Sequence, residues 1–390
     1  MTDRLNDIRL RLNELDDQLL SLLSERRELS IEVAKSKVET SKPVRDAKRE
    51  QELLVKLINN GKDKYELDAQ YITKIFHTII EDSVLLQQAY LQNLLNPALS
   101  RKPLARVAFL GSSGSYSHLA SRQYFSRRNT ELIELSCDHF KEVAQTVESG
   151  HADYGVLPIE NTSSGSINEV YDLLQHTTLY IVGEITQPIE HCLLANSEVR
   201  LEQIKTLYSH PQPHQQCSEF LSRLDGVTLE SCASTADAMK KVKDLDSPEV
   251  AAIGNASSGK LYGLQPIQGN IANQTENHTR FIVVARKPVD VSMQIPAKTT
   301  LIMSTSQEAG SLVESLLVLQ RYGINMTKLE SRPIMGNPWE EMFYVDLEAH
   351  LESEGMQHAI NELTKLTRHL KVLGCYPSEN IQATQVKMSE

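Results

Sequence analysis

The sequence predicts a multidomain protein with an all-helical block, then an α/β block, then a small α+β block. Up to about residue 95, apolar residues recur at alternating spacings of three and four, as in amphipathic helices. From Arg106, short apolar runs such as RVAFL, YGVLPI and FIVVA alternate with helical stretches, which is typical of buried strands in an α/β domain. From residue 298 the predicted order is βαββαβ, the ferredoxin-like unit typical of small regulatory domains.

Two stretches of linker-like composition separate these blocks. The first, residues 96–103, reads NPALSRKP, and the second, residues 287–298, contains two prolines. Such composition interrupts helices and strands, so we expect domains at residues 1–95, 104–286 and 298–380. A chain of 390 residues is long enough for each of them to form its own hydrophobic core.

Charge and composition argue against several classes of protein. The chain has 40 basic and 51 acidic residues, a net charge of -11, which disfavours nucleic acid as the main partner. No apolar run is long enough to span a membrane, and the start, MTDRLNDIRLRLNELDD, is too charged for a secretory signal. Five scattered cysteines without a C-x-x-C pair, and histidines without a ligand pattern, predict a reduced cytoplasmic protein with no metal or cofactor.

The most informative feature of the helical block is a set of polar residues on otherwise apolar helix faces. Along the first predicted helix, the positions spaced by three and four residues are all apolar except Arg26. Glu50 interrupts a second apolar face, and Ser83 a third, with Gln87 one turn further on. Buried charge costs free energy unless a complementary group satisfies it. These residues therefore suggest a site for a polar ligand inside a helical bundle.

Basic residues in the same block indicate that this ligand is an anion. Arg26 and Lys37 are 11 residues apart, close to three helical turns, and therefore share a face, with Arg49 on the second helix. Arg9 is 17 residues before Arg26, about 25 Å along a straight helix, too far for both to bind one small molecule. If Arg9 contributes, it comes from a second copy in an intertwined dimer, which would also enlarge a small core. Composition alone leaves open a second interpretation, solvated basic residues on a coiled-coil dimerisation arm.

The run ERRELSIEVAKSK, followed by PVRDAKRE and IIEDSVLLQQ, resembles the all-helical chorismate mutase domain of enteric-type bifunctional proteins. A pericyclic rearrangement needs only a compressed conformer and donors facing the charge that develops on the ether oxygen. The resemblance implies carboxylate clamps at Arg9 of the partner chain and Arg26, ether-oxygen donors at Lys37 and Gln87, ring-hydroxyl ligands at Glu50 and near Asp46, and a carboxylate lining at Arg49 and Ser83.

Four loops of the α/β block are unusually rich in hydroxyl, amide and glycine residues. GSSGSYS at residues 111–117 follows a strand and opens a helix, which offers N–H groups to an anion, although it is not a P-loop. PIENTSSGS at 158–166, SHPQPHQQ at 209–216 and the Ser-Thr pair at 234–235 add further donors. Capping and turn chemistry explains any single one of these loops better than a ligand site does.

Together, GSSGSYS, PIENTSSGS, SHPQPHQQ and HTRF resemble a prephenate dehydratase domain. The resemblance implies two α/β lobes with the substrate in the cleft between them. It makes Thr279 the principal catalytic residue, whose hydroxyl helps the ring hydroxyl to leave as carbon dioxide is lost. The implied substrate-binding residues are Ser115 and Ser117, near a carboxylate, and Glu160, Asn161, Ser209 and Gln216.

Two motifs of the last block resemble the phenylalanine-binding motifs of the ACT-type regulatory domain fused to prephenate dehydratases. Gly310-Ser311-Leu312-Val313 begins a predicted helix, where free N–H groups would bind an amino acid carboxylate, and Glu330-Ser331-Arg332-Pro333 ends a strand. Ser311 departs from the usual motif, Gly-Ala-Leu-Val. We expect this departure to change the affinity for the effector more than the identity of the effector. The alternative for this block is that it only dimerises.

These resemblances cover nearly the whole chain, in order. They predict a bifunctional enzyme of phenylalanine biosynthesis that converts chorismate to prephenate and then to phenylpyruvate, with feedback inhibition by L-phenylalanine. We expect a homodimer or larger homo-oligomer without nucleic acid or membrane partners. The rival predictions are a non-catalytic small-molecule sensor with a helical dimerisation arm, and a DNA-binding regulator, against which the acidic balance counts. Because the catalytic candidates end at Phe281, removal of residues from about Lys298 is expected to abolish inhibition and spare catalysis.

Overall fold

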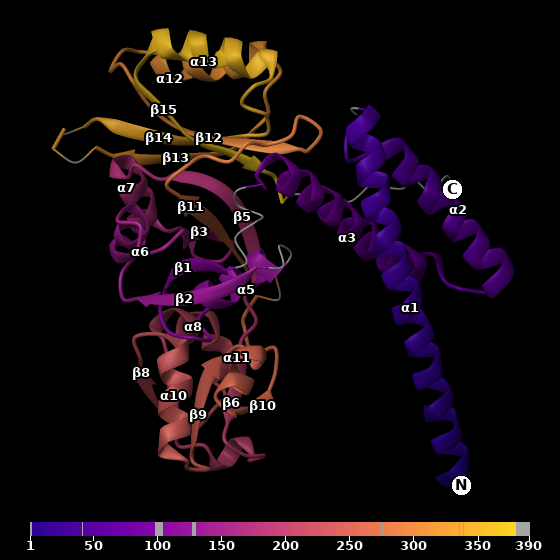
Figure 1. The fold of residues 1–390 in the computed structure, drawn as a ribbon. Helices are drawn as coiled ribbons and strands as arrows, with labels where there is room; N and C mark the ends of the chain where they lie inside the picture. The colour runs from indigo at the N-terminus through magenta and orange to yellow at the C-terminus, as the bar shows by residue number, and fades with distance from the viewer. Residues whose placement is uncertain are drawn as a thin grey trace. The chain divides into compact units, whose positions relative to one another are not determined.

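The computed structural model describes residues 2–40, 42–97, 104–126, 130–274, 276–334, 336–337 and 339–379. The chain divides into two compact units (Figure 1). The first contains residues 1–101, 290–296 and 380–390, and the second contains residues 102–289 and 297–379. None of the helices in the described ranges combines the length and apolar character needed to cross a membrane.

The first unit consists of three helices, α1 (Thr2–Thr40), α2 (Ala47–Tyr65) and α3 (Ala69–Leu95). Asp46 and Asp68 begin α2 and α3 by accepting hydrogen bonds from backbone N–H groups of the first turn. The core contains Leu54, Ile80, Val84 and Leu91, and it also contains Ile295 from the segment between the two later blocks. That segment, which has a linker-like composition, therefore packs against the helices.

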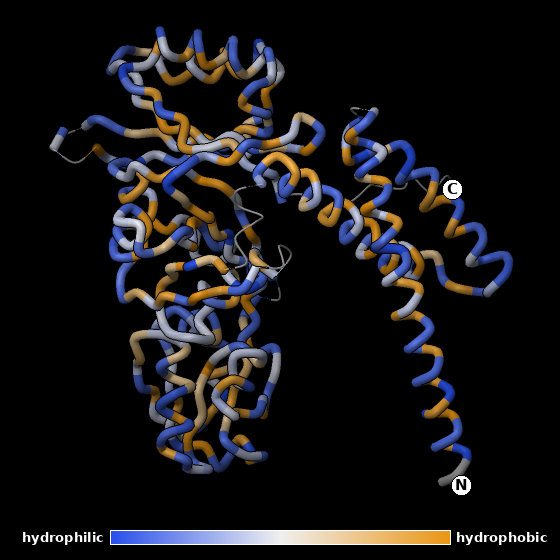
Figure 2. The backbone as a smooth tube through the Cα atoms, in the orientation of Figure 1, coloured by the Kyte–Doolittle hydropathy of each residue, from blue (hydrophilic) through white to orange (hydrophobic). Residues whose placement is uncertain are grey.

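The N-terminal half of α1 carries an apolar face that is exposed in the single chain. Apolar residues recur along this part of the helix (Figure 2), and five on the predicted seam are 41–57% exposed: Leu5, Ile8, Leu12, Leu15 and Leu19. Exposed apolar surface of this extent is typical of an interface. The apolar seam that the periodicity predicts is therefore present, and it is exposed in a single copy of the chain.

The second unit begins with a lobe built on one mixed sheet, in the order β2-β1-β3-β11-β5, with β4 paired to β3. Parallel pairing joins β1 to β2 and β3, whereas β11 runs antiparallel to both β3 and β5. The strands are β1 (Leu104–Leu110), β2 (Glu131–Cys137), β3 (Tyr154–Asn161), β4 (Gly165–Ser166), β5 (Tyr180–Pro188) and β11 (His278–Ala285). The helices are α5 (Tyr116–Ser126), α6 (Phe140–Glu148) and α7 (Asn168–His176).

A second lobe has a five-stranded sheet in the order β10-β6-β9-β7-β8. Its strands are β6 (Cys192–Ala195), β7 (Thr206–Ser209), β8 (Thr228–Ser231), β9 (Val250–Gly254) and β10 (Gln265–Gln268). Its helices are the short 3-10 helix η1 (Leu201–Gln203), α8 (Pro211–Gln216), α9 (Ser218–Leu221), α10 (Thr235–Leu245) and α11 (Ala256–Leu261). The chain enters this lobe after β5 and returns to the first sheet through β11.

The rest of the second unit forms an antiparallel sheet in the order β13-β14-β12-β15. The elements are β12 (Ala297–Thr305), α12 (Ser311–Arg321), β13 (Met326–Pro333), β14 (Glu341–Leu347), α13 (Glu354–Leu366) and β15 (Thr367–Pro377), in the predicted order βαββαβ. Both helices lie on the same side of the sheet (Figure 1).

The other face of this sheet is part of the core of the first lobe. Tyr344 and Tyr376 share one buried cluster with Leu157 and Tyr171, and the Tyr344 hydroxyl donates to the Tyr171 carbonyl oxygen. A side chain at Gly374 would have its Cβ 2.0 Å from the carbonyl oxygen of Ile181. A chain cut at Lys298 would therefore expose the core of the first lobe. This packing argues against the expectation that such a cut spares catalysis, which stays a prediction.

Candidate active sites

A cavity of about 280 Å³ lies among the three helices of the first unit. Its lining residues are Arg26, Leu29, Ser30, Val33, Lys37, Val44, Asp46, Arg49, Glu50, Leu53, Ile80, Ser83, Val84 and Gln87. All of the residues predicted for the first site therefore surround one cavity, except Arg9, which is exposed elsewhere on α1.

The Arg26 guanidinium is held against α3. It donates to the Ser83 hydroxyl and to the carbonyl oxygen of Ile79, 3.3 Å away. Burial lowers the pKa of Arg26 from its ordinary value, and the charge of Asp82 opposes that change. A guanidinium keeps its charge in proteins and has five N–H donors. The polar interruptions at these positions thus form one arrangement, in which α3 orients a cation on α1.

Lys37 lies on the same helix, three turns further on. Its ammonium group donates to the Val44 carbonyl oxygen and to Gln87 Oε1, the latter at 3.1 Å. Burial lowers the pKa of Lys37, while Asp46 and Glu50 raise it. Because an ammonium group has three N–H donors, one remains for a ligand in the cavity.

Two acidic residues lie at the beginning of α2. The Asp46 carboxylate accepts from the backbone N–H of Arg49 at 3.0 Å, as expected of a helix cap. Glu50 Oε2 lies 3.3 Å from Arg45 Nε, and its side chain is 13% exposed. These carboxylates can accept a hydrogen bond from the hydroxyl group of a ligand whose anionic groups lie against Arg26 and Lys37.

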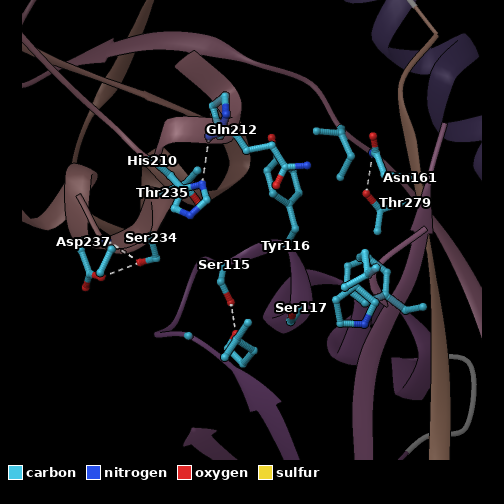
Figure 3. A pocket seen from close by; sticks show the side chains of 18 of the residues that line it. Ser115, Tyr116, Ser117, Asn161, His210, Gln212, Ser234, Thr235, Asp237 and Thr279 are labelled. Carbon is cyan, nitrogen blue, oxygen red and sulfur yellow. Dashed lines mark hydrogen bonds between the residues drawn. The ribbon is translucent and has the colours of Figure 1, made fainter. Parts of the chain in front are cut away.

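A larger cavity, about 500 Å³, lies between the two lobes of the second unit (Figure 3). Among the residues that the structure describes, no lysine or arginine lines it. The lining residues are Leu110, Gly111, Ser115, Tyr116, Ser117, Cys137, Asp138, Phe140, Pro158, Asn161, Ile167, Ile189, His191, His210, Gln212, Pro213, Gln216, Ala233, Ser234, Thr235, Asp237, Thr279 and Phe281. Ser115, Ser117, Asn161, Gln216 and Thr279 of the predicted set thus lie together.

Asn161 and Thr279 form one wall of this cavity (Figure 3). They pair across β3 and β11, and Asn161 Nδ2 donates to Thr279 Oγ1 at 2.9 Å. The side-chain oxygen of Asn161, Oδ1, accepts from the backbone N–H groups of Ser163 and Ser164, both at 2.9 Å. Because Asn161 occupies the Thr279 oxygen as an acceptor, the hydroxyl hydrogen of Thr279 is available to a bound molecule.

The first glycine loop aims the N-terminus of α5 into the cavity. Gly111 and Gly114 have φ values of +84° and +92°, a conformation that side chains rarely adopt. Ser115 Oγ donates to the Leu110 carbonyl oxygen at 3.1 Å, and the Gly114 N–H donates to His118 Nδ1 at 2.9 Å. The loop is therefore closed by side chains.

Sequence reasoning missed the buried His191, which joins the predicted residue Gln216 to Tyr116 on the cavity wall. His191 Nε2 lies 2.8 Å from Gln216 Oε1, and His191 Nδ1 lies 3.2 Å from the Tyr116 hydroxyl. Burial lowers the pKa of His191, although Gln216 opposes the change. The only signal was a histidine directly before the buried strand CLLA, a pattern that also fits an ordinary structural histidine.

Glu160 and Ser209 do not line the cavity. Side chains alternate along a strand, so Glu160 points away from Asn161 and pairs with Lys328 Nζ at 2.8 Å and Arg280 Nη1 at 3.3 Å. Ser209 is buried at the end of β7 and donates to the carbonyl oxygen of His210 at 2.9 Å. Neither residue touches the space in which the substrate is predicted to bind.

The predicted effector residues lie at the start of α12 and on β13. Gly310 caps α12 with φ +92°, and Ser311 Oγ lies 2.7 Å from Ser306 Oγ. Leu312 packs at the edge of the helix core, whereas Val313 is 59% exposed.

On β13, two of the predicted effector side chains point to the first lobe of the same chain. Glu330 accepts from Ser166 Oγ at 2.6 Å, and Arg332 makes two 2.8 Å hydrogen bonds to Asp172. The carbonyl oxygen of Pro333 accepts a hydrogen bond from Gln175 Nε2 at 3.5 Å. Pro333 is two residues after Ser331.

Two family models match this chain, one over the helices and one over the two α/β lobes. Residues 8–88 match the family model described as chorismate mutase type II, and residues 107–289 match that of prephenate dehydratase. Bifunctional chorismate mutase/prephenate dehydratases of Enterobacter agglomerans and Escherichia coli K12 are each 57% identical to this chain, with 96% of both chains covered.

Two solved structures resemble the α/β part. A prephenate dehydratase from Arthrobacter aurescens in complex with L-Phe covers 72% of this chain and 92% of its own, at 26% identity and a TM-score of 0.64. GqqA, described as a novel type of quorum quenching acylase, covers 70% of this chain and 98% of its own, at 30% identity and a TM-score of 0.63.

The chain belongs to the family of bifunctional chorismate mutase/prephenate dehydratases. It is an enzyme that joins an isomerase and a lyase of phenylalanine biosynthesis, and a non-catalytic sensor is not favoured.

Proposed function

We propose that each cavity is one active site, with chorismate rearranged among the helices and prephenate converted to phenylpyruvate between the α/β lobes. The observation that supports this most directly is that polar residues from three helices surround one cavity, while Asn161 and Thr279 face another. We also propose functional domains at residues 1–95, 104–286 and 298–380, and a cytoplasmic enzyme without a cofactor.

In the helical site, Arg26 binds one carboxylate of chorismate, while Lys37 and Gln87 donate to the ether oxygen. Glu50 and the backbone near Asp46 hold the ring hydroxyl, and Arg49 and Ser83 complete the carboxylate lining. In the rearrangement, the C–O bond of the ether breaks as a C–C bond forms, so negative charge develops on the ether oxygen. A fixed Lys37 N–H donor stabilises that charge without reorganising.

Arg9 completes the helical site from a second copy of the chain. Arg9 does not line the cavity of its own chain, and the apolar face around it is exposed. A homodimer in which the α1 helices exchange would cover that face and bring a second guanidinium to each substrate. Binding both carboxylates would hold the compact conformer that reacts.

In the α/β site, the Thr279 hydroxyl donates to the ring hydroxyl of prephenate as that group leaves. The C–C bond to the ring carboxylate breaks, its electron pair enters the ring, and the C–O bond breaks. The products are carbon dioxide and hydroxide, and the hydroxide takes a proton from solvent to become water. Asn161 fixes the Thr279 oxygen, and Ser117 and Gln216 offer donors to the remaining carboxylate. Ser115 lies near that carboxylate, with its own hydroxyl bonded to the Leu110 carbonyl oxygen. Glu160 and Ser209 support this site from outside the cavity.

The βαββαβ block is a ferredoxin-like, ACT-type regulatory domain that binds L-phenylalanine and inhibits the dehydratase. Support comes from its sheet order and from the L-Phe complex of the Arthrobacter aurescens enzyme. The proposed effector residues are Gly310, Ser311, Leu312 and Val313 on α12 and Glu330, Ser331, Arg332 and Pro333 on β13. Ser331→Ala is expected to weaken inhibition about 10-fold and leave the uninhibited rate unchanged.

Incubation of the full chain with chorismate, with prephenate and phenylpyruvate followed separately, tests the two-site assignment. Both products should accumulate, and supplied prephenate should also yield phenylpyruvate. Failure to form phenylpyruvate from supplied prephenate would contradict the second site alone.

A further inference from the structure

A cluster of buried charged side chains lies directly behind the wall formed by Asn161 and Thr279. The neighbouring residues in each strand, Glu160 and Arg280, form the next pair of the β3–β11 ladder. Because side chains alternate across a strand, this second pair projects toward the C-terminal sheet. The β3–β11 register shifts between Arg280 and Phe281, and a local irregularity of this kind re-aims the side chains beside it.

Arg280 is bound by acidic and hydroxyl groups from both parts of the second unit. Its guanidinium lies 2.8 Å from Glu184 on β5, 2.5 Å from Asp346 on β14 and 3.1 Å from the Tyr376 hydroxyl on β15. The side chain of Arg280 is 12% exposed, and those of Glu184 and Asp346 are 3% and 8% exposed. The C-terminal sheet thus supplies Asp346 and the Tyr376 hydroxyl to a buried cation that Glu184 of the first lobe also pairs with.

Lys328 connects the same cluster to the proposed effector strand. Its ammonium group lies 2.8 Å from Glu160, 3.4 Å from Glu330 and 3.2 Å from the Ser166 hydroxyl. Glu330 and Ser166 are themselves joined at 2.6 Å. Ser166 follows the turn whose N–H groups hold Asn161 Oδ1. Strand β13 therefore contacts both the strand and the loop that fix Asn161.

Removal of the Lys328 charge would leave Glu160 with Arg280 alone, and Arg280 is already shared by two other carboxylates. Glu160 would then move toward solvent or take a different pairing, and Asn161, the next residue, would move with it. Thr279 depends on Asn161 for its orientation, so a small shift would misalign the hydroxyl that acts on the substrate. Substrate binding by the other donors of the cavity would change less.

We propose that Lys328, from the C-terminal block, positions the Asn161–Thr279 pair through Glu160, and that the same ion pair transmits the effect of the bound amino acid to the dehydratase site. This inference rests on the proposed function of the α/β cavity. It makes Glu160 a positioning residue that acts from behind the strand, without touching substrate. An effector that moves β13 would change the reaction rate through this contact.

A double-mutant cycle on the full chain tests the inference. Lys328→Met keeps the length of the side chain and removes its charge, and Glu160→Gln keeps the shape of its partner. We expect each single change to lower dehydratase kcat about 10-fold, with KM for prephenate changed less than about twofold. The double variant should be no slower than the slower single variant, because both changes break one contact. Lys328→Arg should restore most of the rate.

The same variants are then assayed with L-phenylalanine. Lys328→Met should shift the half-inhibitory concentration at least about 10-fold. Lys371→Met is the matched control, since Lys371 is another partly buried lysine of the C-terminal block that contacts the first lobe, through the Thr177 carbonyl oxygen. It should keep kcat, KM and inhibition unchanged. The near-UV circular dichroism spectrum and the thermal unfolding midpoint of each variant report whether the second unit is folded.

Two results would overturn the inference while the proposed function stands. Multiplicative effects of the two changes would show that they act independently, and a raised KM with unchanged kcat in Glu160→Gln would make Glu160 a substrate ligand. A wild-type chain that is inactive on prephenate would instead contradict the proposed function, and the inference with it.

Discussion

The two cavities differ in the groups that they offer to an anionic ligand. The helical cavity is lined by Arg26, Lys37 and Arg49, with Asp46 and Glu50 beside them. Within the described part of the chain, the α/β cavity has no lysine or arginine in its lining, and offers hydroxyl groups, amides and the N-terminus of α5. Chorismate and prephenate are both dicarboxylates, so the charge of the substrate alone does not explain the difference.

The difference follows from what each reaction does to the carboxylates. The rearrangement keeps both of them, so cations can bind them equally in the substrate and in the transition state while holding the reactive conformer. The second reaction expels one carboxylate as carbon dioxide, and its negative charge disperses as the bond breaks. A cation beside that group would stabilise the substrate more than the transition state and slow the reaction. Neutral donors avoid this cost.

The strongest test of the comparison is Lys37→Ala. Loss of a fixed donor to the ether oxygen is expected to lower mutase kcat by about 10²–10³-fold. Dehydratase activity on supplied prephenate should be unchanged, because its cavity contains no residue of α1. Coupled assays of the two steps measure both effects in one preparation.

Arg27→Ala is the matched control for Lys37→Ala. Arg27 neighbours Arg26 but pairs with Asp82 on the surface, with a side chain 57% exposed. It should change neither activity. Equal loss of both activities in folded Lys37→Ala would contradict the separation of the two sites.

Thr279→Ala is the converse change in the neutral cavity. Its kcat for prephenate should fall about 10²-fold with little change in KM, because the hydroxyl acts mainly in the transition state. Thr279→Ser, which keeps the hydroxyl, should retain most of the rate, and mutase activity should be normal in both. If Thr279→Ala raised KM and left kcat intact, Thr279 would only bind substrate.

Mixed dimers ask whether the charged cavity is shared between two chains. An Arg9→Ala chain and a Lys37→Ala chain are each expected to be inactive as mutases. After subunit exchange, about half of the dimers would be hybrids with one of two sites intact, so about a quarter of wild-type activity should return. No recovery after demonstrated exchange would place Arg9 in the site of its own chain, or outside any site.

Much of the charged cavity could be predicted from the sequence, whereas parts of the neutral one could not. Arg26, Glu50 and Ser83 interrupt regular apolar patterns, and such exceptions point to a common site before any fold is known. Hydroxyl-rich loops carry no comparable signal, since caps and turns use the same residue types. His191 therefore remained unnoticed before the buried strand CLLA.

Orientation was the other information missing from the sequence. Motif resemblance grouped Glu160 with Asn161, but adjacent strand residues face opposite sides, and Glu160 points to Lys328. The linker-like composition of residues 287–298 indicated an independent last block. In the structure, Tyr344 and Tyr376 lie in the core of the first lobe. Composition predicts where a linker lies between two blocks. Only the packing of side chains shows whether the two blocks share a hydrophobic core.

The smallest expected effect concerns pH, and it separates the two cavities by their titrating groups. Burial holds the pKa of Lys37 below its ordinary 10.5, although Asp46 and Glu50 partly oppose this. The donor role of Lys37 needs the protonated form, which is lost as pH rises through that lowered pKa. Mutase kcat/KM should therefore decline at a pH below 10.5, and the decline should move to higher pH in Lys37→Arg, since a guanidinium stays charged. Dehydratase activity on prephenate, measured in the same buffers, should not follow this decline, because no lysine lines its cavity. Identical alkaline declines of both activities, unmoved in Lys37→Arg, would instead report a change of the whole protein and would remove Lys37 from the role of donor.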